Sequence, residues 1–542
     1  MAFSAGKNYK RPIGALLAAV ACLASGCTSP PVTSETRAEL SPKAVQLAAG
    51  DGMLAVKVAI NRQQVNRYFK KFHTLVVWNA DRQQEFVLVD RSDSSATHSY
   101  FAGSLPPGTY AIRAIKSEVD NAQVEGWYRP DVKERFPGFT VAAGRLTDLG
   151  SIAFIRAHDP PGTGRHAWGQ VDAPYDQAAE LRQFAPALAA TLAAQPALGW
   201  DADARLQTLR KTLDDMRSLS MQANAPARLA DGTMLFGEAF GRIAVRTPAG
   251  AWQTVQTPAA LPIRAIHAAS DGTLLAGSDE GILMIRRAAG AGWDQLALPV
   301  DDGSVIDIGP LPGTDELLVV LQTRDRFLGL STSRASPGTG TWTERFSRPR
   351  QLFRASGADA QGLVVRSGDS LVFASGSLLA RQETLTWDSK LRSWKPAALD
   401  TDGVPYYWTV LADGSLVRFE GIPLTGGRFF NMSSDGGAHW EKRAKLPFRW
   451  GPLVFVSDQT GYVVCTAGPP DFERVGNVDF TPSLWRTDDT GRTWTQVNGL
   501  PAFPRRLVDL GQPGHLGYAS DDGRFFSSTD GGKHWTLEKQ VP

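Results

Sequence analysis

Cysteine is scarce in this chain, which has three in 542 residues. Cys22 and Cys27 lie close to the N-terminus, and Cys465 stands alone in the apolar stretch Gly-Tyr-Val-Val-Cys-Thr. A single cysteine cannot form an internal disulfide bond, so the body of the chain is not a disulfide-stapled domain. We expect Cys465 to be a buried, inert thiol rather than a nucleophile, because an unionised thiol packs as a small apolar group.

Strong net charge is also missing. Charged residues make up 21% of the sequence and the formal net charge is +2. This balance gives no electrostatic field of the kind that binds nucleic acid. No cluster of residues at metal-ligand spacing and no phosphate-binding glycine loop stands out, so we expect no metal and no cofactor.

Long hydrophobic runs are absent except near the N-terminus. Ile13–Leu23 is apolar but too short to span a membrane comfortably as a permanent helix. It follows the basic residues Lys7, Lys10 and Arg11, which is the order found in a secretory signal peptide. We therefore predict that residues 1–27 are a targeting segment and not part of the fold.

The targeting segment ends in Leu-Ala-Ser-Gly-Cys, residues 23–27, which resembles a bacterial lipobox. The resemblance implies that Cys27 carries lipid, including palmitate, and becomes the N-terminus of a lipoprotein. Thr28 after the cysteine resembles outer-membrane sorting signals, so we expect a lipid-anchored protein of the bacterial cell envelope, facing the periplasm or the surface. The alternative is an ordinary secretory signal with an incidental cysteine. Residues 28–50, rich in Ser, Thr, Pro and Glu, are predicted to be a flexible tether.

One turn motif occurs three times in the last quarter of the chain, and it reads Ser/Thr-x-Asp-x-Gly-x-x-Trp. At this spacing the aspartate and the hydroxyl group can accept hydrogen bonds from backbone N–H groups just ahead of them. The glycine is expected to adopt a positive φ, and the tryptophan opens the next strand. The residues predicted to have these structural roles are Ser433, Asp435, Gly437, Trp440, Thr487, Asp489, Gly491, Trp494, Ser528, Asp530, Gly532 and Trp535.

Less complete copies of the motif precede these three. With them, seven tryptophans mark the repeat: Trp252, Trp293, Trp342, Trp394, Trp440, Trp494 and Trp535. Successive tryptophans are 41 to 54 residues apart, which is about the length of a four-stranded propeller blade. We therefore predict a mainly β protein with a seven-bladed β-propeller over residues 225–542; six or eight blades are the nearest alternatives.

Two further patterns support a propeller. Asp-Gly pairs begin at Asp231, Asp271, Asp413 and Asp522, and each pair precedes apolar residues, which indicates a hairpin. Because an open row of blades leaves sheet edges unpaired, we expect the ring to close. In many propellers both chain ends complete one blade, which here would pair the strand after Trp535 with the segment near Ala227–Leu235.

The three complete copies resemble the Asp-box, or BNR repeat, of sialidase-like β-propellers. This resemblance implies that Asp435, Asp489 and Asp530 hold rim turns in shape and do no catalysis. Among such proteins, single seven-bladed propellers of the photosystem II assembly-factor type bind protein partners on one face. The resemblance therefore implies partner binding, and it implies nothing about photosynthesis.

Residues 51–160 are predicted to form a small all-β domain. Seven short runs have strand-like composition, with turn residues between most of them: 53–60, 73–79, 85–90, 97–102, 109–116, 138–142 and 151–156. Leu105–Tyr110 and Thr147–Gly150 resemble turns of prealbumin-like or carboxypeptidase-regulatory-like β-sandwiches. Such a resemblance implies a non-catalytic packing or binding module.

Residues 161–224 are predicted to be a helical connector. Leu206, Leu209, Leu213 and Met216 recur at intervals that place them on one face of a helix. We expect this segment to pack on both flanking domains; the alternative is a helical hairpin that forms a dimer.

Enzymatic chemistry finds little support in the sequence. A sialidase resemblance would imply a Phe/Tyr-Arg-Ile-Pro segment, but Leu261–Arg264 has these residue types in the wrong order. An inverting glycoside hydrolase would need two carboxylates about 6.5–9.5 Å apart, which sequence cannot place. We expect a non-catalytic scaffold or assembly factor with no catalytic residue. The alternative is a glycoside hydrolase, sialidase-like or xyloglucanase-like, acting on envelope or host glycans.

Aromatic and arginine side chains gather at protein interfaces. Arg449, Trp450, Arg505 and Arg506 combine these residue types near predicted loops, and we predict that they form a binding surface. Asp471–Phe480 lengthens one repeat and could overhang the mouth of the central channel. We expect the N-terminal lipid to hold this protein at the membrane. The expected partner is an envelope protein or a glycan.

Overall fold

The computed structural model describes the chain from residue 46 to residue 539. The undescribed residues within these limits are 61–71, 93–97, 118–134, 157–165, 172–180, 182–185, 194, 216–224, 301–302, 324, 351–360, 368, 377–382, 397–403, 412, 422–427, 436, 438, 446–448, 467–481, 503 and 521–522. The predicted targeting segment, Cys27 and most of the tether therefore lie outside the described residues. Of the helices in the described part, none is long and apolar enough to cross a membrane.

Residues 52–171 hold two four-stranded sheets, with the strand orders β4-β1-β7-β8 and β3-β2-β5-β6. The strands are β1 (Gly52–Ile60), β2 (Phe72–Asn79), β3 (Gln84–Val89), β4 (His98–Leu105), β5 (Gly108–Ser117), β6 (Gly138–Val141), β7 (Leu146–Arg156) and β8 (His166–Val171). Each of the seven predicted runs overlaps one of the strands β1–β7; the runs over 85–90, 97–102 and 138–142 each extend one residue beyond the strand. The strand β8, in the predicted helical connector, was not predicted; it pairs with β7 and extends the sheet past the predicted border at residue 160.

The two sheets share one hydrophobic core, to which strand β1 contributes alternate residues. Leu54, Val56 and Val58 face this core together with Leu75 and Val77 of β2. The other set of β1 residues points to the opposite side of the sheet, because side chains alternate along a strand. Both sets are buried, which explains why the sequence of β1 is apolar almost throughout.

Two helices follow the sheets, α5 (Pro186–Ala193) and α6 (Ala204–Asp215). Helix α5 packs Ala189 and Leu192 against the second set of β1 residues. Helix α6 places Leu209 in the core that the two sheets share. In the described part of the chain, both helices of the predicted connector thus pack on the N-terminal sheets.

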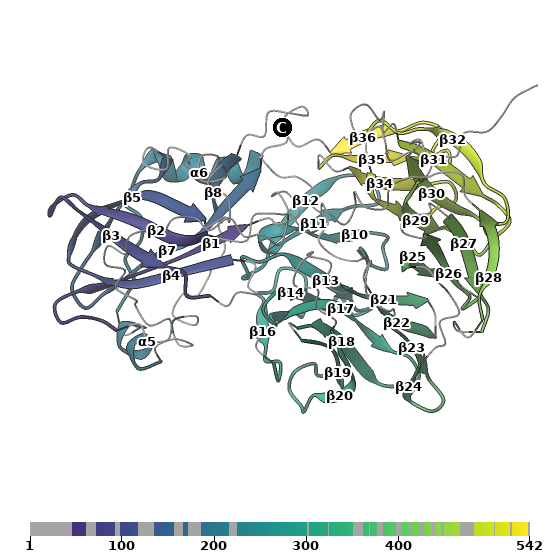
Figure 1. Cartoon of the computed structure of the whole chain (residues 1–542), viewed down its shortest axis with the longest axis horizontal. Helices are drawn as coiled ribbons and strands as arrows, with labels where there is room; N and C mark the ends of the chain where they lie inside the picture. Colours follow the sequence, from purple (N-terminus) through teal and green to yellow (C-terminus); the bar gives the residue numbers. More distant parts are fainter. Residues whose placement is uncertain are drawn as a thin grey trace, which may run out of the picture. The chain divides into compact units, whose positions relative to one another are not determined.

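The described residues between 227 and 539 form seven four-stranded sheets. The four strands of each sheet follow one another along the chain and pair antiparallel with their sequence neighbours (Figure 1). In chain order the strands are β9 (Ala227–Arg228), β10 (Met234–Gly237), β11 (Arg242–Arg246), β12 (Trp252–Gln256); β13 (Ile263–Ala268), β14 (Leu274–Ser278), β15 (Leu283–Arg286), β16 (Asp294–Leu296); β17 (Ser304–Leu311), β18 (Glu316–Gln322), β19 (Arg326–Ser333), β20 (Thr343–Pro349); β21 (Gln361–Ser367), β22 (Ser370–Gly376), β23 (Glu383–Asp388), β24 (Ser393–Pro396); β25 (Val404–Val410), β26 (Leu416–Gly421), β27 (Arg428–Ser433), β28 (Glu441–Lys445); β29 (Arg449–Phe455), β30 (Gly461–Thr466), β31 (Pro482–Thr487), β32 (Thr495–Gly499); β33 (Pro504–Asp509), β34 (Leu516–Ser520), β35 (Phe525–Ser528) and β36 (Thr536–Lys539). A short 3-10 helix, η1 (Ala239–Gly241), joins β10 to β11.

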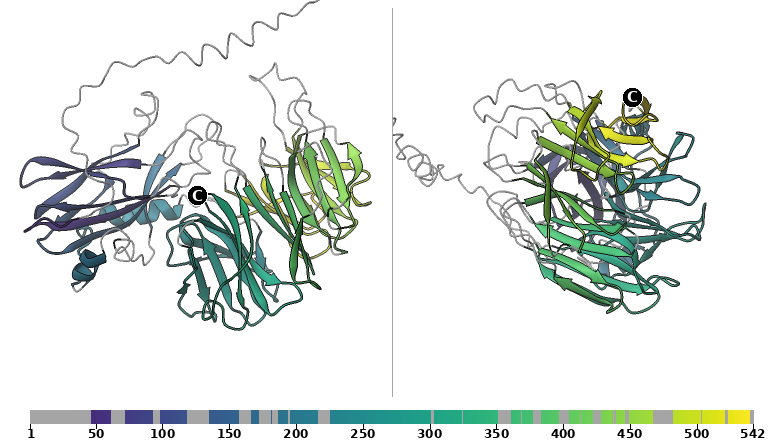
Figure 2. Two further views of the ribbon diagram at one scale, coloured as in Figure 1. Left: turned by 60° about the horizontal axis from the view of Figure 1, so that its bottom comes forward. Right: turned by 90° about the vertical axis from the view of Figure 1, so that its right-hand side faces the viewer.

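These sheets form a closed ring, a β-propeller. A hydrophobic cluster lies between each sheet and the next; Leu275 and Val305, for example, join the second sheet to the third. The last such cluster joins Phe525 of the seventh sheet to Phe236 of the first. First strands such as β13, β17, β21 and β25 lie toward the centre of the ring, and fourth strands such as β16, β20, β24 and β28 lie toward its rim (Figure 1). Figure 2 shows the same sheets from two other sides.

The ring closes in a way that corrects one expectation. Strand β36 pairs with β35 inside the seventh sheet, and β9 pairs with β10 inside the first, so the two chain ends do not share a sheet. Side chains make the closure instead: Arg246 binds Glu538 through two hydrogen bonds of 2.7 and 2.6 Å. Lys539 adds a contact with the Trp252 ring, 4.9 Å from its centroid.

The seven repeat tryptophans occupy equivalent places. Each lies at the start of the fourth strand of its sheet or within two residues of it, from Trp252 in β12 to Trp535 before β36. Each indole packs into one of the clusters between sheets: Trp494 meets Phe430 edge to face at 5.6 Å, and Trp535 meets Tyr518 at 4.8 Å. The spacing read from the sequence therefore marks one structural unit per sheet.

Candidate functional site

The three complete motifs lie between the third and fourth strands of the fifth, sixth and seventh sheets. In each turn the hydroxyl residue donates to the aspartate and accepts a hydrogen bond from the glycine N–H; for Thr487, the distances to Asp489 and Gly491 are both 2.8 Å. The glycines Gly437, Gly491 and Gly532 have φ values of 96°, 79° and 87°. The expectation of positive φ at these positions is therefore confirmed.

The aspartates of these turns accept several hydrogen bonds from their own loops. Asp435 accepts from the backbone N–H of His439 at 2.9 Å, and its other oxygen lies 2.6 Å from His439 Nδ1. Asp530 repeats this arrangement with His534. The backbone N–H groups, followed by the hydroxyl and imidazole groups, hold the pKa values of both aspartates well below the ordinary range. The oxygens of both carboxylates are thus occupied by hydrogen bonds within their own turns.

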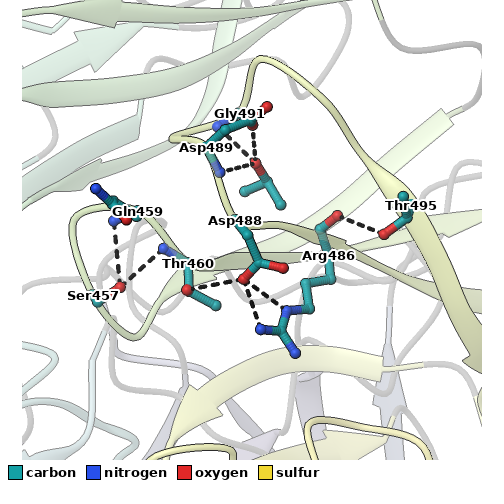
Figure 3. Close-up of polar contacts among 9 residues, drawn as sticks. Ser457, Gln459, Thr460, Arg486, Asp488, Asp489, Gly491 and Thr495 are labelled. Carbon is teal, nitrogen blue, oxygen red and sulfur yellow. Dashed lines mark hydrogen bonds and ion pairs between the residues drawn. The ribbon is translucent and has the colours of Figure 1, made fainter.

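Figure 3 shows how the turn of the sixth sheet is tied to the neighbouring turn between β29 and β30. Thr460 Oγ1 donates to Asp488 at 3.1 Å, and Arg486 donates to the same carboxylate at 2.9 and 2.7 Å. The Thr490 hydroxyl donates to the carbonyl oxygen of Asp458 at 2.9 Å. The turns after the first and third strands therefore lie on one face of the ring, which we call the turn face.

The opposite face carries the starts of the first strands and the connections between the second and third strands, because each sheet is an antiparallel meander. We call it the start face. Arg449 and Trp450 begin β29, and Arg505 and Arg506 follow Pro504 at the start of β33. These two first strands are neighbours in the ring, so the four predicted binding residues lie on one face and on adjacent sheets. The side chains of Arg449, Trp450 and Arg505 lie outside what the structure describes.

Five of the first strands pair irregularly with the second strand of their sheet. The pairing with the second strand shifts register between Ile263 and Ala265 in β13, between Val305 and Asp307 in β17, and in β25, β29 and β33 as well. A bulge leaves one residue out of the ladder and re-aims its side chain. On the start face these irregular residues include Arg264, in β13, and Arg505.

Two ion pairs near the ring centre were not predicted from the sequence. Arg264 donates to Asp279 at 3.0 and 3.1 Å, and Ser304 of the next sheet donates to the same carboxylate at 2.6 Å. Arg366 of β21 binds Asp307 of β17. The one signal in the sequence is Gly309, because a glycine within a strand often marks a close approach of another group. In the structure, a Cβ at this position would lie 2.8 Å from Arg366 Nε.

His267 stands beside this second pair. Burial and the positive charge of Arg366 hold the pKa of His267 below its ordinary value, although Asp307 acts in the opposite direction. The imidazole is therefore neutral at pH 7. Arg264, the arginine of the segment compared with a sialidase motif, is bound to Asp279.

Three further predictions concern an inserted segment, a cysteine and metal binding. Asp471–Phe480 follows β30 and precedes β31 in the chain and lies outside the described residues. Cys465 is buried in β30, with 1% of its surface exposed. Among the residues that the structure describes, no group of three or more His, Cys, Asp and Glu could hold a metal ion.

The fold places the chain among the β-propeller proteins. No protein-family model and no curated protein matches its sequence. Similar solved structures include YCF48 bound to D1 peptide, with 14% identity, coverage of 58% of this chain and 92% of that chain, and a TM-score of 0.43. YCF48 from Cyanidioschyzon merolae is 14% identical, with coverage of 57% of this chain and 96% of that chain and a TM-score of 0.42. The GH74 enzyme of Niastella koreensis is 11% identical, with coverage of 60% of this chain and 67% of that chain and a TM-score of 0.33. At these identities the likeness concerns the fold alone.

Proposed function

We propose that this chain is a non-catalytic, lipid-anchored scaffold or assembly factor of the bacterial cell envelope, which binds a protein or glycan partner. In this proposal the seven sheets are the seven blades of one Asp-box propeller, and the N-terminal sheets are a β-sandwich. Cys27 carries the lipid and residues 28–50 form the tether, so the protein faces the periplasm or the surface at the outer membrane.

One observation carries the binding proposal: Arg449, Trp450, Arg505 and Arg506 begin neighbouring first strands on the start face. Arginine and tryptophan are the residue types that dominate binding energy at interfaces. A partner that meets the ring on this side can contact two sheets together.

The state of the carboxyl groups favours a scaffold over a hydrolase. A glycoside hydrolase needs two carboxyl groups that are presented to its substrate. Near the ring centre, Asp279 and Asp307 are each bound by an arginine. Carboxylate oxygens that a guanidinium already occupies are held by the protein and are not presented to a glycan.

The proposal is tested by capture from envelope extracts with matched variants of the two faces. In the start-face variant, Arg449, Trp450, Arg505 and Arg506 are all changed to alanine; the control is Arg492→Ala with Lys533→Ala in the exposed turns. We expect one partner to be captured by the wild type and the control, and at least ten-fold less by the start-face variant. Equal capture by all three proteins would contradict the assigned face.

A parallel assay addresses the hydrolase alternative. The purified protein is incubated with envelope and host glycans, and released reducing ends are measured. We expect no release above the level given by heat-denatured protein. Turnover that depends on the folded chain would replace the scaffold proposal with a glycoside hydrolase.

A further inference from the structure

A lysine lies inside the most buried strand of the N-terminal sheets. Lys57 of β1 has no exposed surface, and its neighbours Val56 and Val58 are equally buried. Lys57 belongs to the set of β1 residues that points away from the shared core, together with Ala55 and Ala59. A buried ammonium group is costly unless it is paired, so the position of its partner is informative.

The partner comes from the propeller. Glu280 lies in the connection between β14 and β15, on the start face, and its carboxylate is 3.7 Å from Lys57 Nζ. The second oxygen of this carboxylate contacts Nδ1 of His98, a residue of β4 with 3% of its surface exposed. Burial alone would raise the pKa of Glu280, but the charges of His98 and Lys57 lower it to about 2.

The backbone presents Glu280 in an unusual conformation. Its φ is 60°, a value that costs free energy for a residue other than glycine. The turn is held on both sides: the Gly281 N–H donates to the Gly303 carbonyl oxygen at 2.7 Å, and Asp279 is bound by Arg264. A strained residue held in this way is preorganised to project its carboxylate.

An apolar cluster, four of whose six residues are alanines, also joins the two surfaces. Ala59, Ala153 and Val171 of the N-terminal sheet form one cluster with Ala239, Phe240 and Ala260 of the propeller. Alanine lets the two surfaces approach closely but contributes little apolar area, so this cluster alone is a weak attachment. The contacts of Glu280 with Lys57 and His98 therefore decide whether the surfaces stay together.

We propose that Glu280 is a latch that holds the N-terminal β domain on the start face of the propeller and allows it to separate. When the surfaces part, all three polar groups can be hydrated, so separation costs less than it would for an apolar interface of the same size. When they meet, the carboxylate contacts both Lys57 and His98 and has a fixed direction. The interface is thus specific and reversible.

The test compares the wild-type full chain with Glu280→Gln, which keeps the shape of the side chain and removes its charge. Spin labels at Val87→Cys in β3 and Leu391→Cys in the β23–β24 turn report the spread of distances between the two parts; both native side chains are exposed. Glu344→Gln, an exposed glutamate of β20, is the matched control. We expect a narrow distribution for the wild type and the control, and at least a two-fold broader one for Glu280→Gln.

An unchanged distribution in Glu280→Gln would overturn the proposal. Near-UV circular dichroism of the tryptophans establishes that each variant is folded. If Glu280→Gln does not fold, His98→Gln replaces it, because it removes only one of the two side chains that contact the carboxylate. A broader distribution in this milder variant supports the latch, and an unchanged one overturns it.

Discussion

Asp489 shows what the acidic residue of the repeated turn does. Its carboxylate accepts a hydrogen bond from the Thr493 N–H at 2.9 Å and another from the Thr493 hydroxyl at 2.7 Å. Asp489→Ala leaves this N–H without its acceptor, as in the loss of a helix N-cap, so we expect the free energy of unfolding to fall by about 1–2 kcal/mol. Urea denaturation measures the change.

Asp489→Asn is the matched control for that prediction, because it keeps one acceptor oxygen. We expect it to lose less than half as much stability as the alanine variant. An alanine variant as stable as the wild type would contradict the structural role of this aspartate.

Cys27 can be tested separately from the rest of the chain. If the lipobox resemblance holds, cells fed a palmitate analogue should label the wild-type protein and not Cys27→Ser. Cys465→Ser should keep the label, because Cys465 is buried within β30. Label that persists in Cys27→Ser would contradict the predicted lipid anchor, but it would not affect the assignment of the propeller fold.

Local chemistry made some residues predictable and left others open. The positive φ of Gly437, Gly491 and Gly532 followed from the turn motif itself. Asp231, Asp271 and Asp413 lie between the first and second strands of their sheets, but Asp522 falls between β34 and β35, the second and third. An Asp-Gly pair indicates a hairpin, and nothing in the pair says which hairpin of the sheet it is.

At the scale of the turn, Gly491 is constrained in two ways. Its φ is 79°, and a Cβ placed on it would lie 2.0 Å from the Phe430 ring of the preceding sheet. Gly491→Ala should therefore lower the free energy of unfolding by about 2–4 kcal/mol, through backbone strain and displacement of a buried ring. Thermal unfolding followed by circular dichroism would show the shift.

Gly499 provides the control for this prediction. It lies in β32, the strand that follows the same turn, and a Cβ there meets nothing within 4 Å. Gly499→Ala is expected to change stability by less than about 0.5 kcal/mol. If both alanine variants behaved alike, the close approach of the turn to Phe430 would not matter for stability.

The strands could be predicted from the sequence, but the ion pairs between sheets could not. The strands β1–β7 follow from alternating composition and turn residues, which are local signals. The bond between Arg366 and Asp307 joins residues 59 positions apart, and that between Arg246 and Glu538 joins residues 292 apart. Such pairs depend on how sheets are arranged around the ring, so composition and spacing could not identify them.

At the scale of the whole molecule, the ring closes at the seam between the first and last sheets, where side-chain contacts join the two ends of the propeller. Arg246 and Glu538 have only 9% and 13% of their side-chain surfaces exposed. Trp252 Nε1 adds a hydrogen bond to Glu538 at 3.3 Å, and Phe236, Val508 and Phe525 pack around the pair. A strand shared by both ends would make this closure through backbone hydrogen bonds; here an ion pair and an apolar cluster replace it.

Glu538→Gln tests that closure. Burial alone would raise the pKa of Glu538, but its hydrogen bonds with Arg246 lower the pKa overall. A carboxyl group whose pKa is lowered on folding adds stability above its unfolded pKa of about 4.3, and this contribution disappears as the pH falls through the folded pKa. We expect Glu538→Gln to lose about 2–3 kcal/mol at pH 7, because it leaves the Arg246 charge nearly buried.

The pH profile and a second variant separate this effect from general damage. The difference in free energy of unfolding between the wild type and Glu538→Gln should shrink as the pH is lowered from 5, because protonation removes the same charge from the wild type. Arg246→Gln with Glu538→Gln should lose less than the sum of the two single variants, since the pair is removed together. Additive losses that do not change with pH would show that the seam is held by the apolar cluster alone, and the ring would then close without its ion pair.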